Sequence, residues 1–105
     1  MRRTALSIDL MDRSRFPAGT TFVARGDDLD EHADVVAVDL SRPDAVAAIA
    51  RLRSAGSAAR VVAYGSHVDR AGLEEARAAG ADEVLARSEF FADVESALAP
   101  APPPT

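Results

Sequence analysis

An aspartate at the end of an apolar segment is the residue in this sequence best placed to do chemistry. Asp39 closes the run 35–39 and is followed by leucine, serine, arginine and then Pro43. Open α/β sheets place their binding crevice beyond the carboxyl ends of the strands. If 35–39 is a central strand, the Asp39 carboxylate lies in that crevice. Arg87 follows a later apolar run and could meet Asp39 there in an ion pair that only stabilises the edge of the sheet.

A second polar segment, residues 64–69, contains a serine, a histidine and an aspartate. Neighbours in sequence seldom orient as nucleophile and base, and the G-x-S-x-G elbow of serine hydrolases is missing. His67 is better explained as an exposed loop residue, and His32 lies in an acidic run typical of a solvated loop. The glycines form neither a dinucleotide-binding nor a phosphate-binding loop. We therefore expect a binding module and not an enzyme.

Composition narrows the function classes further. The chain has no cysteine, its twelve basic residues are all arginines, and its formal net charge is -5. Without lysine and cysteine, Schiff-base and thiolate chemistry are excluded. The acidic balance argues against a nucleic-acid partner, because binding to a phosphate backbone needs a basic face. The lack of cysteine suits a reducing compartment, so we expect a cytoplasmic protein, and no apolar run is long enough for a membrane span.

The elements that must position Asp39 alternate between strands and helices. Short apolar or β-branched runs predict buried strands at 35–39, 60–64 and 82–86, with two further candidates at 5–9 and 21–24. Helices are expected at Asp44–Ala55, Arg70–Ala79 and Glu89–Leu98. This alternation predicts one α/β domain over residues 1–98, a three-layer parallel sheet with helices on both faces.

Capping residues support these helix limits. Pro43 fits a first helical turn, and Gly56 and Gly80 lie where a left-handed C-terminal cap is needed. Asp69 is an N-cap candidate, with Val68 and Leu73 placed to form a hydrophobic staple. Ser88 is expected to cap the last helix in the same way. Three apolar positions of that helix recur at helical spacing and should face the sheet: Phe90 or Phe91, Val94 and Leu98.

The first crossover and the C-terminal tail depart from the regular pattern. Residues 10–19 are too few for a normal parallel crossover and contain Pro17 and Gly19, so a first helix must be a turn or two at most or missing. The tail 99–105 is rich in proline and is expected in polyproline II or disordered form.

The segment from Asp39 to Pro43 resembles the phosphate-accepting sequence of response-regulator receiver domains. In that family an Asp-Leu-x-x-Pro sequence follows the third strand, and Asp39 falls on the phosphoacceptor and Pro43 on the proline. The resemblance continues at Gly80-Ala81-Asp82 and in the spacing over most of 35–98. It implies a flavodoxin-like, doubly wound sheet of five strands in the order 2-1-3-4-5.

The rest of the family's pocket is incomplete in this sequence. The resemblance places Asp9 on the metal-binding acid after the first strand, but Ile8 replaces its acidic neighbour. The hydroxyl residue after the fourth strand falls on Gly65, with Ser66 following, and the family lysine falls on Arg87. A guanidinium keeps the positive charge but is wider than an ammonium. The chain therefore resembles a degenerate receiver, or pseudo-receiver.

These departures leave two functions open. The resemblance implies that Asp9, Asp39 and the Ser41 carbonyl could still hold Mg²⁺ weakly, although no cofactor is expected to be required. Our first interpretation is a stand-alone regulatory domain that acts through protein contacts, on a signalling protein or a histidine kinase. The second is an active single-domain response regulator, phosphorylated on Asp39 in a two-component phosphorelay. Gly65 and the missing lysine favour the first, while Asp9, Asp39 and Pro43 favour the second.

A shortened first helix has a consequence for assembly. It would leave part of one sheet face uncovered, and monomers seldom expose large apolar patches. We therefore expect a two-fold homodimer that uses residues 10–19 and the face beside the last helix. Alternatively, Leu10, Met11 and Phe16 fold down and fill the gap within one chain.

Overall fold

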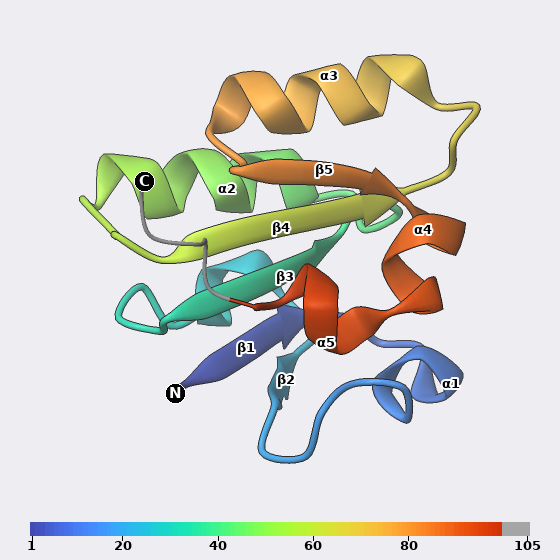
Figure 1. The fold of residues 1–105 in the computed structure, drawn as a ribbon. Helices are drawn as coiled ribbons and strands as arrows, with labels where there is room; N and C mark the ends of the chain where they lie inside the picture. The colour runs from blue at the N-terminus through green and yellow to red at the C-terminus, as the bar shows by residue number, and fades with distance from the viewer. Residues whose placement is uncertain (100–105) are drawn as a thin grey trace, which may run out of the picture.

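Five strands form one parallel sheet in the order β2-β1-β3-β4-β5 in the computed structural model, which describes residues 1–99 (Figure 1). The central strands β3 and β4 pair with Val36 opposite Val61. The predicted parallel α/β class and strand order are therefore confirmed, while the expected proline-rich tail lies outside the described residues from position 100 onward. The strand bounds are β1 (Arg3–Leu6), β2 (Thr21–Val23), β3 (Val35–Asp39), β4 (Arg60–Gly65) and β5 (Glu83–Ala86).

Helices cover both faces of the sheet. Successive side chains of β3 point to opposite faces, so each face has apolar side chains for the helices to bury. Val36 and Val38 join one core cluster, and Val35 and Ala37 join the other. Within residues 1–99, no helix has the length and apolar character needed to cross a membrane. The first cluster packs under α2 (Ala45–Ser54), α3 (Arg70–Ala79) and the 3₁₀ turn η1 (Gly26–Asp28), and the second under α4 (Arg87–Ala92) and α5 (Val94–Ala97) (Figure 1).

Two predicted elements have different limits in the structure. The first strand ends at Leu6 instead of continuing to Asp9, because Asp9 caps the following short helix. The single helix expected at 89–98 is split into α4 and α5 at Asp93, whose backbone leaves helical geometry and whose carboxylate accepts a hydrogen bond from Ser96 N at 3.1 Å. Ser88 is not the cap that we expected, since α4 begins one residue earlier, at Arg87.

The other capping predictions have mixed outcomes. The Asp69 carboxylate accepts a hydrogen bond from Gly72 N at 3.0 Å, which confirms Asp69 as the N-cap of α3. Gly56 and Gly80 follow α2 and α3 with φ of 80° and 122°, conformations that favour glycine. The predicted staple is wrong because Val68 is exposed. Pro43 lies in the turn before α2, which begins at Ala45.

An aromatic side chain covers the sheet face that a longer first helix would cover. Helix α1 (Leu10–Arg13) is a single turn, as the sequence predicted. Phe16, which follows it, is buried and meets Phe22 edge to face, with ring centroids 5.3 Å apart. The prediction that Phe16 fills the gap is confirmed, but Leu10 and Met11 remain 78% and 70% exposed and do not.

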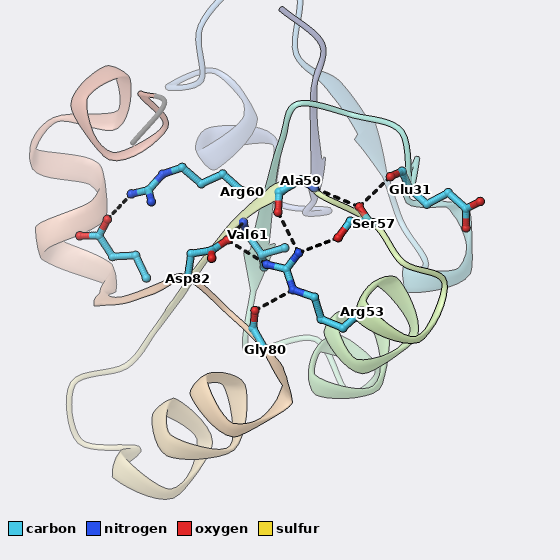
Figure 2. A network of polar contacts seen from close by, with 9 residues as sticks. Glu31, Arg53, Ser57, Ala59, Arg60, Val61, Gly80 and Asp82 are labelled. Atoms are coloured by element: carbon cyan, nitrogen blue, oxygen red, sulfur yellow. Dashed lines mark hydrogen bonds and ion pairs between the residues drawn. The ribbon is translucent and has the colours of Figure 1, made fainter. Parts of the chain in front are cut away.

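Arg53 ties α2 to the amino-terminal edge of the sheet (Figure 2). Its guanidinium donates to the carbonyl oxygens of Gly80 and Ala59, both at 2.9 Å, and to the Asp82 carboxylate at 2.8 Å. Asp82 also accepts from Val61 N at 2.8 Å, so one ion pair joins the starts of β4 and β5. These bonds satisfy two backbone carbonyl groups and a carboxylate, and they fix the edge opposite to Asp39.

Candidate functional site

Asp39 lies at the carboxyl end of β3 and is 5% exposed. Its Oδ1 accepts hydrogen bonds from Ser41 N at 2.9 Å and from Ser41 Oγ at 2.8 Å. The chain turns away from the sheet here, and the carboxylate holds that turn in the manner typical of aspartate. Within residues 1–99 the second oxygen, Oδ2, accepts no hydrogen bond, so this atom is the one available to a ligand.

Arg87 is bonded to Asp12 and not to Asp39, which corrects the ion pair expected from the sequence. It is the first residue of α4, and its guanidinium donates to Asp12 Oδ1. Asp12 is 3% exposed although it lies on the one-turn helix α1. The hydrogen bond to Asp12 raises the pKa of Arg87, and the nearby charge of Asp39 adds to this effect. Asp39 and Arg87 therefore share one edge of the sheet, while the buried Asp12 holds the cation.

Asp9 serves mainly as a helix cap. Its Oδ1 accepts hydrogen bonds from Met11 N at 2.8 Å and Asp12 N at 3.1 Å, and its side chain is exposed. This cap bends the chain after β1 so that Asp12, three residues later, turns back under Arg87. Sequence reasoning missed Asp12, and the one signal available was an acidic residue at capping distance from Asp9 in a segment too short for a regular helix.

These residues do not fit the magnesium site that Asp9, Asp39 and Ser41 were expected to form. One oxygen of Asp9 and one of Asp39 already accept two N–H or O–H donors each. Nowhere in the described part of the chain do three histidine or acidic side chains gather closely enough to hold a metal ion. The Arg87 guanidinium already places a positive charge at this edge, close enough to Asp39 to feel its charge, and this opposes the binding of a divalent cation. We therefore derive no chemistry through a metal.

The Tyr64 side chain lies in the core beside the site. It is fully buried on β4 and stacks on Phe90, with ring centroids 4.3 Å apart. Burial is the main cause that raises the pKa of its hydroxyl, and the negative charge of Asp39 is the second cause. The phenol therefore stays neutral. The Ser7 hydroxyl is close enough to lower that pKa slightly, yet the two groups do not reach hydrogen-bond geometry. The Tyr64 hydroxyl, Ser7 Oγ and Asp12 Oδ2 are thus three buried polar atoms without a partner.

The two residues predicted after β4 have different surroundings. Gly65 is buried, and a Cβ added to it would lie 3.1 Å from Leu40 Cβ, so a larger residue is crowded there. This contact gives a packing reason for glycine where receiver domains have a hydroxyl residue. Ser66 is exposed in the loop and accepts a hydrogen bond from Val68 N at 3.4 Å. Neither residue supplies a donor to Asp39.

A basic hollow opens beside this edge, between the segment after α1, the β4–α3 loop and α4. Its volume is about 520 Å³. The guanidiniums of Arg15 and Arg87 lie over the ring of Phe91, 5.4 Å and 4.9 Å from its centroid. We call it the basic hollow; the residues that line it include Arg15, Ser66, His67, Arg87, Ser88 and Phe91.

Comparison with known proteins supports the fold. No family model matches the sequence, and no curated protein matches it either. A solved structure does match: a response regulator protein from Burkholderia pseudomallei with a phosphorylated aspartic acid, a calcium ion and citrate. Its TM-score is 0.65 at 16% identity, over 94% of this chain and 67% of that one. The fold is that of a receiver domain. At this level of identity the likeness extends to the fold alone, flavodoxin-like as the sequence predicted.

Proposed function

We propose that this chain is a receiver-like regulatory domain that acts through protein contacts, without catalysis and without a required cofactor. The observation that carries the proposal is the bond between Arg87 and the buried Asp12. A phosphoacceptor site needs a cation aimed at the developing charge on the phosphoryl group. In this chain Arg87, the cation that the resemblance places in this role, is held by another carboxylate, and Gly65 supplies no hydroxyl.

An active response regulator, phosphorylated on Asp39 by a histidine kinase or a small phosphodonor, is the second candidate. The unbonded Oδ2 of Asp39 favours it, because that atom could attack a phosphoryl group. The structural neighbour is described with a phosphorylated aspartate, which is a property of that protein. The observations therefore support a pseudo-receiver more strongly, and one experiment distinguishes it from an active response regulator.

Incubation with acetyl phosphate and millimolar Mg²⁺ separates these functions. We expect the intact mass of the protein to stay unchanged, because Arg87 is bonded to Asp12 and Gly65 offers no hydroxyl to an incoming phosphoryl group. A receiver of known activity in the same reaction shows that the phosphodonor is competent. A mass increase of one phosphoryl group that disappears in Asp39→Asn would establish the active response regulator instead.

We further propose that the protein works in the cytoplasm as a homodimer, with no nucleic-acid or membrane partner. Leu10 and Met11 are the support for pairing, since both are large, apolar and exposed on α1. Phe16 already covers the sheet face, so the contact would be limited to the tip of α1. The absence of cysteine and the net charge of -5 agree with the remaining assignments.

Sedimentation equilibrium tests the dimer directly. We expect a dimer at high micromolar concentration, and a monomer for Leu10→Ser/Met11→Ser, because these changes remove the apolar contact. Ala47→Ser, on the exposed side of α2, is the control and should leave the dimer intact. A wild-type protein that stays monomeric over the whole concentration range would exclude pairing.

A further inference from the structure

The basic hollow concentrates positive charge on an acidic protein. The chain as a whole has a net charge of -5, yet among residues 1–99 no aspartate or glutamate lines this hollow, whereas Arg15 and Arg87 do. These residues are far apart in sequence and are brought together by the fold. A local positive potential on an otherwise negative surface favours the binding of small anionic groups. An extended polyanion such as nucleic acid needs a larger basic face than this hollow offers.

The two arginines differ in how their charge is used. One nitrogen of Arg87 is bonded to Asp12, which anchors that side chain. The guanidinium of Arg15 makes no hydrogen bond or ion pair within residues 1–99, and it rests on the Phe91 ring. An aromatic face holds a guanidinium in place while leaving its N–H edge free to bond a planar carboxylate. Arg15 is therefore a positioned donor without an acceptor.

Part of the lining of the hollow is apolar, which restricts the chemical class of the ligand further. The ring of Phe91 and the side chain of Ala92 line it, beside the Ser66 and Ser88 hydroxyls. A volume of about 520 Å³ is in the range of ligand-binding clefts and holds two amino-acid side chains. A bare phosphate would use the arginines and leave the apolar part of the lining empty. A carboxylate next to an apolar side chain would use both.

We propose that the basic hollow binds an acidic segment of a partner protein, in which a glutamate or aspartate lies next to a large apolar side chain. The carboxylate bonds Arg15 and the free edge of Arg87, and the apolar side chain packs on Phe91. This inference rests on the proposed function, since it names the surface through which the regulatory domain contacts its partner. It does not depend on the state of Asp39.

Peptide binding to the full-length chain, followed by amide and arginine side-chain NMR shifts, tests this inference. The probe is a blocked twelve-residue peptide with one leucine between two glutamates in a glycine-serine frame, and the matched probe has glutamine for glutamate. We expect shifts concentrated at Arg15, residues 66–67 and residues 87–92 with the first peptide and none with the second. Arg15→Gln should weaken binding about tenfold, the effect of losing one charge-assisted hydrogen bond.

Matched controls decide what the result means. Arg77→Gln changes an exposed arginine on α3, away from the hollow, and should leave binding unchanged. Equal binding of the glutamine peptide, equally tight binding of inorganic phosphate alone, or shifts of the hollow on self-association without peptide would each overturn the inference. Failure here with an unchanged mass after acetyl phosphate leaves the proposed pseudo-receiver intact, whereas phosphorylation of Asp39 overturns that proposal and not the hollow.

Discussion

Replacing Phe90 with alanine is expected to lower the free energy of unfolding by about 4 kcal/mol. Phe90 is fully buried, stacks on Tyr64 and meets Phe16 with ring centroids 5.7 Å apart. Because α1 has only one turn, these rings do the covering that a full helix would do on this face of the sheet. Truncation removes the stacked ring and leaves a cavity that the short helices around it cannot close.

Urea denaturation followed by circular dichroism measures this loss. Val68→Ala is the matched control, since it shortens an apolar side chain at an exposed position. It should change the free energy of unfolding by less than about 0.5 kcal/mol. A loss below about 1.5 kcal/mol for Phe90→Ala would mean that the aromatic cluster does not hold this face together.

The sheet could be predicted from the sequence because its strands carry continuous apolar runs. The runs 35–39 and 60–64 are buried on both faces, which is typical of parallel strands, and both appear in the structure within one residue of the predicted limits. The limits of β1 could not be predicted as well, because Asp9 serves as a helix cap and ends the extended segment early. The split of the last helix depends on one backbone conformation at Asp93 that periodicity does not encode.

The site was only partly predictable because its main contact is long-range. Asp39 was found from its place at a strand end, and Arg87 from the resemblance to receiver domains. Their partners were not found. Asp12 lies 75 residues from Arg87 in sequence, so only the assembled fold shows that they meet. The same is true of Arg15, whose position over Phe91 depends on the turn that follows α1.

The bond between Asp12 and Arg87 is expected to stabilise the folded protein. In Arg87→Gln the Asp12 carboxylate is left buried without a cation, and we expect a loss of about 2 kcal/mol at pH 7. This value is below that of a fully buried pair because the Arg87 side chain is 44% exposed. Urea denaturation at pH 7 measures this loss against the wild type.

A double-mutant cycle with Asp12→Asn isolates the contact. Asparagine keeps the shape of the side chain but has no charge, so Arg87→Gln in that background should cost less stability. An equal loss in both backgrounds would show that Arg87 acts only by packing on Phe91 and Tyr64. The pair would then no longer explain why the cation is withheld from Asp39, and the case for a pseudo-receiver would rest on Gly65 alone.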